Sequence, residues 1–447
     1  MAGGHGPALN GGSGPPAPAG RTGRDAVAAV WRIESARIVG ALTRYTGDFA
    51  LAEDLAQEAL AEALVAWPRE GVPRHPAGWL LTVGRRRAID AFRRRAALDQ
   101  RYAALARDLP EGGAVTGGPA VAPPDDGDVP WDPDRVDDDV LALMFTACHP
   151  VLSREAGVAL TLRVVGGLTS DEIARAFLVP TATVQARITR AKKALRAAGV
   201  PFEVPSAAER AERLGAVLGV IYLIFTQGSS AATGDRVIRY DLAGEAQRLA
   251  RVLSRLVPGE PEAHGLLALL ELTAARFPAR VGPDGEAVLL EHQDRRRWDR
   301  SAIHRGRAAL TRARHLAPGP GAYGLQAAIA ECHAVAPSVA ETDWERIVRL
   351  YDALARLAPS PVVELNRAVA VSMARGPAEA LPLVDRLAAD GALKGSQLLP
   401  TVRAELLTRL GRTAEARTEF TRAADLCGNA RERAVLERRI TELDEPA

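Results

Sequence analysis

The chain has 447 residues and a formal net charge of only +2, so it is long enough for two to four domains and is not basic as a whole. Any surface that binds nucleic acid must therefore be a local one. The three cysteines have no paired spacing, which excludes a disulfide framework and a cysteine zinc site and favours a reducing, cytoplasmic location. Aromatic residues are sparse while alanine and arginine are abundant, so we expect an all-α fold.

Composition predicts five segments along the chain. The first is rich in Gly, Ala and Pro without an apolar core, so a disordered tail is expected rather than a signal peptide. Another is rich in Pro and Gly and acidic toward its end, as in a flexible linker. The predicted segments are a tail at 1–24, a first domain at 25–98, an acidic linker at 99–135, a second domain at 136–200 and a C-terminal helical domain at 206–447.

Residues 47–67, GDFALAEDLAQEALAEALVAW, predict an amphipathic helix with an acidic outer face. Leu51, Leu55, Ala59 and Leu64 form its apolar stripe, and acidic and amide side chains cover the rest. This charge would repel nucleic acid, so the helix suits a basic protein partner. An ordinary surface helix is the alternative interpretation.

Residues 79–95, WLLTVGRRRAIDAFRRR, predict a second amphipathic helix, which carries six arginines. Its apolar side consists of Leu81, Ala88, Ile89 and Phe92, and its polar side of Arg86, Asp90, Arg93 and Arg94. A basic face with an apolar back is typical of a helix that lies along a phosphate backbone. The alternative is a solvated face on which Asp90 bridges Arg86 and Arg94.

Residues 168–197 predict two short helices joined by a tight turn. A capping box, Thr169-Ser170-Asp171-Glu172, begins the first helix, and Pro180 stands near the start of the second. The second helix has a predicted buried stripe of Val184, Ile188, Ala191 and Leu195. Its opposite side is polar and becomes basic toward the end, as in a helix-turn-helix that reads the major groove.

These segments together carry a family resemblance. Asp54-x-x-Gln57-Glu58, Pro76-x-x-Trp79-Leu80, Arg87-Ala88-Ile89-Asp90 and Arg93-Arg94 resemble region 2 of bacterial sigma factors, in particular the extracytoplasmic-function (ECF) group. Residues 168–197 are similar to region 4 of the same family. The resemblance implies a transcription initiation factor without enzymatic activity, whose partners are core RNA polymerase and promoter DNA. Arg86 stands where ECF factors usually carry Asn, so base selection at this position is expected to differ.

The resemblance also implies roles for individual residues. The loop from Pro68 to Gly78 and the following helix are expected to hold the −10 element. The polymerase-binding residues would be Asp54, Gln57 and Glu58; the −10-binding residues Trp79, Arg86, Arg87, Asp90, Arg93 and Arg94; and the −35-binding residues Thr181, Ala182, Gln185, Ala186, Thr189, Arg190 and Lys193.

Residues 206–447 read as a series of amphipathic helices. The stretches 365–387 and 402–423 align Gly376 with Gly411 and Ala380 with Ala416, at a period typical of tetratricopeptide (TPR) repeats. A solenoid of this kind offers a concave surface for a protein or peptide partner, here of unknown identity. The expected core anchors are Trp298, Trp344 and Tyr351. The chain thus resembles the ECF subgroup with a TPR-like extension, in which the extension regulates initiation and supports activity.

Two tracts, 221–235 and 289–299, also resemble that subgroup, although Thr226-Gln227-Gly228-Ser229 replaces its usual Asn-Glu-Gly-Tyr. The apolar run Leu214 to Phe225 is too short to span a bilayer and predicts a buried helix, so no membrane contact is expected.

No motif for catalysis or for a cofactor is found in the sequence, and no metal site is expected. The charged group Glu291, His292, Asp294 and Asp299 is interpreted as a helix–loop hydrogen-bond network. Two other functional interpretations stay open at this point. One is a TPR-type interaction scaffold, and the other is a conventional helix-turn-helix regulator.

Overall fold

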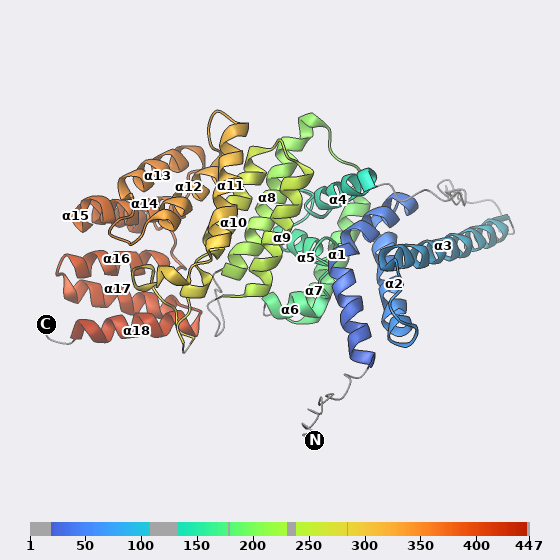
Figure 1. Cartoon of the computed structure of the whole chain (residues 1–447), viewed down its shortest axis with the longest axis horizontal. Helices are drawn as coiled ribbons and strands as arrows, with labels where there is room; N and C mark the ends of the chain where they lie inside the picture. The colour runs from blue at the N-terminus through green and yellow to red at the C-terminus, as the bar shows by residue number, and fades with distance from the viewer. Residues whose placement is uncertain (1–18, 108–132, 178, 230–237, 284, 445–447) are drawn as a thin grey trace, which may run out of the picture. The chain divides into compact units, whose positions relative to one another are not determined.

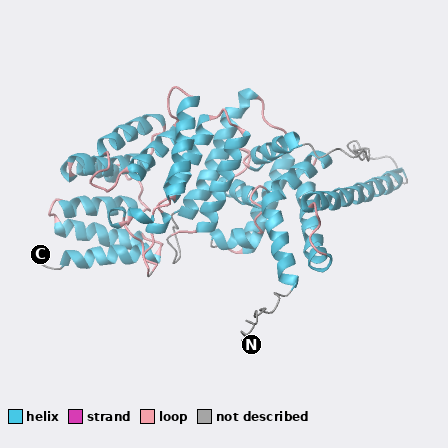
Figure 2. Ribbon diagram, in the orientation of Figure 1, coloured by secondary structure: helices cyan, strands magenta, loops and turns pink. Residues whose placement is uncertain are grey.

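The computed structural model describes residues 19–107, 133–177, 179–229, 238–283 and 285–444 (Figure 1). Every regular element in these ranges is a helix, and an isolated antiparallel bridge joins Val281 and Ala287 (Figure 2). The predicted all-α fold is therefore confirmed. No described helix combines the length and the apolarity that a membrane crossing requires.

The four N-terminal helices are long and pack around an aliphatic core. The largest side chains of this core, Ile38, Leu42, Leu80 and Leu143, are fully buried. Gly84 gives Leu42 room to pack, because an added Cβ would lie 2.8 Å from a Leu42 methyl carbon. The helices are α1 (Ala19–Thr46), α2 (Phe49–Glu70), α3 (Pro76–Arg107) and α4 (Pro133–Ala147).

The described helices cross three of the predicted boundaries in this part. Helix α1 begins at Ala19, inside the predicted tail, so residues 19–24 are helical. Helix α3 continues to Arg107 and α4 starts at Pro133, so both ends of the predicted linker 99–135 are helical, while 108–132 lie outside the described residues. The loop expected from Pro68 to Gly78 is shorter, since α2 ends at Glu70 and α3 begins at Pro76. Single-sequence patterns locate helix ends poorly because terminal turns depend on tertiary contacts.

The helix-turn-helix segment contains α5 (Arg154–Val164), α6 (Ser170–Phe177) and α7 (Thr181–Ala197). The predicted buried stripe of α7 is confirmed, because Val184, Ile188, Ala191 and Leu195 are all buried. The two helices that the sequence predicted between 170 and 197 are therefore present as α6 and α7.

Contacts divide the chain into two compact units that do not follow the predicted domains. The first unit takes the described residues within Met1–Ala147, together with Leu162–Thr169 and Thr189–Val204. The second takes Cys148–Thr161, Ser170–Ile188 and Pro205–Ala447. The predicted second domain, 136–200, contributes to both units, because α5 and α7 each carry a segment of both.

The second unit continues with eleven helices and three short 3-10 turns over the described residues. The first of these helices contains the apolar run Leu214 to Phe225, and Ile221 and Ile224 in it are fully buried, as predicted. The helices are α8 (Ala207–Ser229), α9 (Tyr240–Leu256), α10 (Pro261–Ala274), α11 (Arg300–Leu316), α12 (Ala322–Val335), α13 (Trp344–Leu357), α14 (Pro361–Arg375), α15 (Pro377–Ala389), α16 (Leu398–Arg409), α17 (Thr413–Leu426) and α18 (Ala430–Asp444). The 3-10 turns are η1 (Phe277–Ala279), η2 (Leu290–His292) and η3 (Arg295–Arg297).

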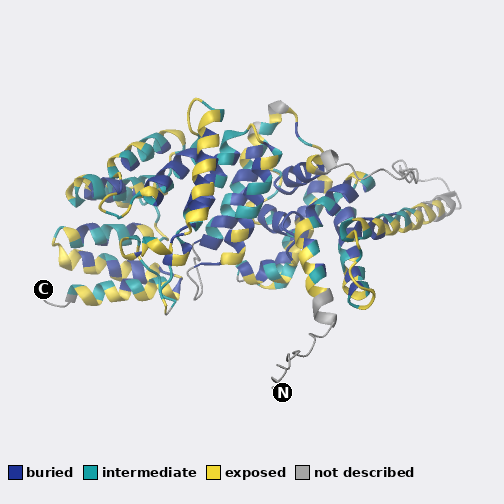
Figure 3. Ribbon diagram, in the orientation of Figure 1, coloured by how far each residue is buried: buried dark blue, intermediate teal, exposed yellow. Residues whose placement is uncertain are grey.

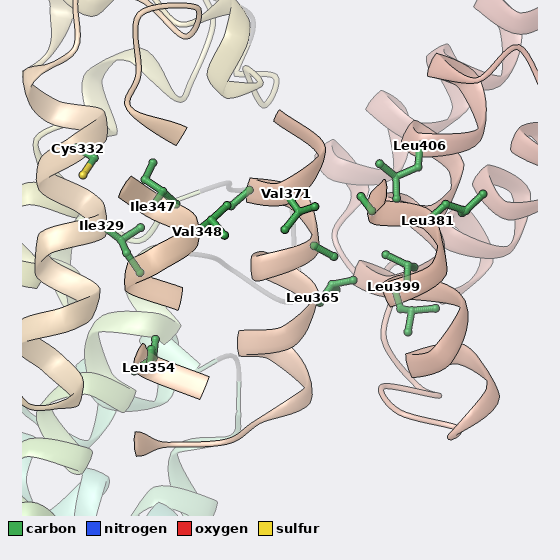
Figure 4. Packing of buried hydrophobic residues seen from close by; sticks show 14 of the residues in the cluster. Ile329, Cys332, Ile347, Val348, Leu354, Leu365, Val371, Leu381, Leu399 and Leu406 are labelled. Atoms are coloured by element: carbon green, nitrogen blue, oxygen red, sulfur yellow. The ribbon is translucent and has the colours of Figure 1, made fainter. Parts of the chain in front are cut away.

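The two aligned stretches near the C-terminus form two consecutive helical hairpins, α14–α15 and α16–α17. Gly376 and Gly411 occupy the turns with φ of 100° and 73°, a left-handed conformation that favours glycine. Ala380 and Ala416 are both fully buried at the start of the second helix of each hairpin. One continuous cluster of aliphatic side chains joins α12 through α16 (Figure 4). The two aligned stretches therefore share a helical hairpin with a glycine in the turn and a buried alanine after it.

The expected aromatic anchors are also in the core. Trp298 is buried, and Trp344 and Tyr351 pack against the cluster of Figure 4. Burial along α10 and α12 is almost continuous, whereas α17 and α18 show broad exposed faces (Figure 3).

Candidate polymerase and promoter-DNA interface

Helix α2 presents the acidic surface predicted to bind polymerase. The Asp48 carboxylate caps its N-terminus by accepting from the amides of Ala50 and Leu51. Asp54 and Glu58, one turn apart, have side chains that are 66% and 52% exposed. Gln57 between them is half-buried. The surface is thus acidic and accessible at both carboxylates.

The predicted apolar stripe of α2 needs a correction. Leu55 and Ala59 are buried as expected, but Leu64 is 39% exposed and Ala63 takes the buried position instead. Glu53, read from the sequence as part of the acidic outer face, is buried. Its burial requires cationic partners, because an isolated buried carboxylate is strongly unfavourable.

Those partners come from the region-4 segment within the first unit. The Glu53 carboxylate accepts a hydrogen bond from Arg163 Nε at 3.1 Å and pairs through its other oxygen with Lys192 Nζ. Lys192 Nζ also lies 2.8 Å from Asp54 Oδ1, which places it on a predicted polymerase-binding residue. Burial alone would lower the pKa of Lys192, but the two carboxylates outweigh this effect and raise it above its ordinary value.

A second ion pair extends this contact toward the start of α2. Arg196 donates to Asp48 Oδ2 at 2.6 Å. Partial burial would raise the pKa of Asp48, but the Arg196 hydrogen bond and the amides of Leu51 and Ala50 outweigh it, so the pKa is lowered. The first half of α2 is therefore paired with the second half of α7 at Asp48, Glu53 and Asp54.

These cationic partners were missed in the sequence reading. Lys193 was assigned to DNA, whereas its neighbour Lys192 makes the contact with α2. Lys192 lies four residues after Ile188 and three before Leu195, so it flanks the buried stripe of α7. A cation beside a buried stripe was the one sequence feature that could have indicated an intramolecular acidic partner. The identity of its partner, 139 residues away, could not be read from one sequence.

The basic face of α3 lies where it was predicted. Arg86, Asp90, Arg93 and Arg94 are exposed, and Leu81 and Ala88 on the other side are buried. Ile89 and Phe92 are only half-buried. The face is therefore accessible to a phosphate backbone.

The bridging role considered for Asp90 is not observed. Arg86 and Arg87 instead donate to the two oxygens of Glu62 on α2, at 3.0 and 2.8 Å. Arg94 Nε donates to the backbone carbonyl of Asp90 at 3.3 Å. Two of the predicted −10-binding arginines thus already have a carboxylate partner within region 2.

Trp79 has a structural partner as well. Its ring meets that of the buried Trp67 edge-on, with the ring centroids 5.7 Å apart. Gly71, with a φ of 89°, ends α2 by donating its amide to the Trp67 carbonyl. The aromatic pair therefore fixes the turn between α2 and α3, and Trp79 keeps a half-exposed position at the start of α3.

The outer side of α7 is accessible. The predicted −35-binding residues at its exposed positions are Ala182, Gln185, Ala186, Thr189, Arg190 and Lys193. Thr181 is half-buried and donates from its hydroxyl to Asp171 Oδ1 at 2.7 Å, which joins the starts of α6 and α7. Thr181 therefore has a role in positioning the recognition helix.

The charged group at 291–299 consists largely of capping residues. Asp294 caps η3 through the Arg296 amide, and Asp299 caps α11 through the Ala302 amide. Glu291 and His292 are exposed. Within the described ranges no group of three or more His, Cys, Asp or Glu side chains is placed to hold a metal ion. The three cysteines are buried free thiols.

Comparison with known proteins identifies the parts of this architecture. Residues 32–97 match the model of Sigma-70 region 2, and residues 142–195 match that of Sigma-70, region 4. Residues 213–314 match a family of unknown function, DUF6596. An uncharacterized protein of Rhizobium meliloti (strain 1021), R00370, is 47% identical over 423 residues, which cover 92% of this chain and 94% of that protein. No solved structure matches the chain.

The fold and the two matched regions define the class as an all-helical promoter-recognition factor of bacterial transcription. The chain belongs to the same family as R00370, and its matches to Sigma-70 regions 2 and 4 support an ECF-type sigma factor. Such factors initiate transcription and are not enzymes. The matches favour this interpretation over an interaction scaffold or a conventional repressor.

Proposed function

We propose that this sigma factor binds core RNA polymerase through Asp54, Gln57 and Glu58 on α2. The observation that carries this proposal is the pair of exposed carboxylates one turn apart on α2, the helix that precedes the arginine-rich α3. Complementary charge on a partner would direct the encounter and set its orientation. Because polymerase and promoter DNA are its partners, we propose that it acts in the cytoplasm.

We further propose that α3 opens the −10 element and that α7 reads the −35 element. Opening requires a base to leave the stack, which costs a few kcal/mol. Arg93 and Arg94 would offset part of this cost through the phosphates of the separated strand. Arg86 and Arg87 would exchange Glu62 for phosphate, and Trp79 and Asp90 would border the same strand. Gln185 and Thr189 would read base edges in the major groove.

The contact between α2 and α7 implies that Lys192 and core polymerase compete for Asp54. Lys192 engages Asp54, so the surface that we assign to polymerase is partly occupied within the chain. We infer that core polymerase displaces Lys192 from Asp54 when the holoenzyme forms. The extension from residue 206, which we propose has a TPR-like partner-binding role, would regulate this step.

Transcription from a defined promoter by core polymerase tests the proposal. An Asp54→Arg, Glu58→Arg double variant should lose core binding. It should keep its helical content, because both side chains are more than half exposed and Lys192, which loses its pair with Asp54, keeps Glu53 as a partner. The matched control is Asp425→Arg with Glu437→Arg, two exposed carboxylates of the second unit, which should leave core binding unchanged. Normal core binding by the folded α2 variant would refute the assignment.

A further inference from the structure

The second unit contains a cavity of about 460 Å³ that the proposed function does not use. Cavities of this size accommodate small molecules. Its wall comes from the end of α10 and the following 3-10 segments, from the start of α16 and from α18. Two leucines from the 289–299 tract, Leu289 and Leu290, form part of the wall.

Two half-buried arginines line this cavity and lie four residues apart, on either side of η1. Arg276 stacks over Trp298, with its guanidinium carbon 5.5 Å from the ring centroid, and its Nε lies 3.4 Å from Gln293 Oε1. Arg280 donates to the backbone carbonyl of Ser229 at 2.7 Å. Neither guanidinium forms an ion pair with a carboxylate of the described residues.

Arg276 and Arg280 differ in this respect from several arginines of the same unit that form ion pairs with buried acids. Arg251 and Arg305 both bind Glu271, and Arg307 binds Glu331. Burial lowers the pKa of Arg276 to about 10, with further contributions from Arg280 and Arg295, so its charge persists at neutral pH without a compensating anion. A desolvated charge of this kind favours an anionic ligand.

Among the described lining residues the only acid is Glu432, whose charge partly offsets the lowering of the Arg280 pKa by burial and whose Oε2 accepts a hydrogen bond from Gln397 at 2.7 Å. The described lining residues include two cations, Arg276 and Arg280, and one carboxylate, Glu432, so their net charge is positive. The rest of the wall is mainly apolar, and two of its leucines, Leu289 and Leu398, are 40% and 46% exposed. An apolar ligand body that covered them would remove this surface from water.

We infer that the cavity binds a small amphipathic anion, whose carboxylate or phosphate group meets Arg276 and Arg280 while its apolar body covers Leu289 and Leu398. The charge and the apolar wall are both required for this assignment, because a bare inorganic anion would leave the leucines exposed. The inference does not depend on the proposed transcriptional role, since the cavity is described within the second unit alone.

Calorimetric titration of the full chain tests the inference with four probes: decanoate, decyl phosphate, decanol and inorganic phosphate, each below the concentration at which it aggregates. We expect decanoate or decyl phosphate to bind at one site per chain. The stronger of the two indicates whether a carboxylate or a phosphate is preferred. Decanol and inorganic phosphate should each bind at least about tenfold more weakly, because each lacks half of the recognised chemistry.

Two variants locate the site. Arg280→Gln removes one charge and keeps most of the stem, and the control Arg296→Gln removes a charge whose side chain is 90% exposed on η3. Val435→Trp fills the cavity without changing its charge. It therefore tests whether the ligand binds in this cavity even if Arg280→Gln does not fold. Arg280→Gln and Val435→Trp should weaken binding about tenfold or more, and the control should not. Absence of one-site binding, equal binding of decanol and decanoate, or unchanged binding by both cavity variants would overturn the inference.

Discussion

The buried carboxylate of Glu53 gives a sharp test of the contact between α2 and α7. Its side chain is only 5% exposed, and the side chains of Arg163 and Lys192 that meet it are each 16% exposed. Glu53→Gln preserves the shape and one acceptor oxygen but leaves two poorly solvated cations facing a neutral group. Lys192 would keep Asp54 as a partner, whereas Arg163 would keep only the Leu168 carbonyl.

The magnitude of the loss follows from this partial compensation. Removing one partner of a fully buried ion pair costs about 3–5 kcal/mol. Because the amide still accepts a hydrogen bond and Asp54 still pairs with Lys192, we expect a loss of about 2–3 kcal/mol in the first unit. The same substitution at Glu58 should cost below about 0.5 kcal/mol, since that side chain is 52% exposed and lies 4.0 Å from Arg87.

Hydrogen exchange of the full chain measures these losses where they occur. The free energy of opening of the α2 amides, residues 49–70, should fall by the expected amount in Glu53→Gln and stay nearly unchanged in Glu58→Gln. Amides of α14–α17 in the second unit serve as an internal reference. If the two variants lose the same protection in α2, the buried triad is not a stabilising feature and the reasoning is refuted.

Three further predictions concern the same surfaces. Lys192→Ala should raise the affinity for core polymerase about two- to fivefold by freeing Asp54, and an unchanged or lower affinity in a binding titration would contradict the competition. Arg93→Ala and Arg94→Ala should weaken binding to all promoters by a similar factor and reduce the salt dependence of that binding. Gln185→Ala and Thr189→Ala should instead change which −35 sequences support run-off transcription. The reverse pattern would show that the two roles are exchanged. The pKa of Asp48 is lowered in the folded chain, so its contribution to stability is complete above the unfolded pKa of 3.8 and is lost as the pH falls through the lower folded pKa. Asp48→Asn should therefore reduce the pH dependence of the free energy of urea unfolding below about pH 4. An unaltered pH profile would contradict this prediction.

The sequence predicted those features that depend on local periodicity. The stripe Val184, Ile188, Ala191 and Leu195 is buried because a 3.6-residue period fixes one face of a helix. The exposed arginines of α3 and the glycine turns at Gly376 and Gly411 follow from equally local rules. Family resemblance added the assignment of these faces to partners, which periodicity does not provide.

Features that depend on contacts distant in sequence were not predictable in this way. Glu53 is buried rather than exposed because Arg163 and Lys192 pair with it, and nothing in residues 47–67 encodes the approach of Lys192. The cavity beside Arg276 and Arg280 combines helices more than 100 residues apart in sequence. Arginines in such sites look like ordinary surface charges until their surroundings are known.

The packing of the helix-turn-helix leads to a final prediction about the extension. Helix α6 and the first half of α7 belong to the unit that begins again at Pro205, not to the unit of region 2. Arg239 is buried and donates to the Ala176 carbonyl at the end of α6, and Leu223 of α8 borders a cavity with Ile173 and Val184. This arrangement indicates that the extension supports α6 and the first half of α7 rather than merely following them.

A chain truncated after Val204 should therefore keep region 2 but lose order in region 4. We expect hydrogen-exchange protection of α2 to persist, while the amides of α6 (Ser170–Phe177) exchange faster than in the full chain, because the apolar side of Ile173 and its neighbours gains solvent access. Core polymerase should still bind through α2, and initiation from promoters that require a −35 element should fall. Full protection of α6 in residues 1–204 would contradict the supporting role. Higher transcription by the truncated chain at matched core occupancy would instead identify the extension as a built-in inhibitor. Such an inhibitor would have to act through surfaces other than those where the extension meets α6.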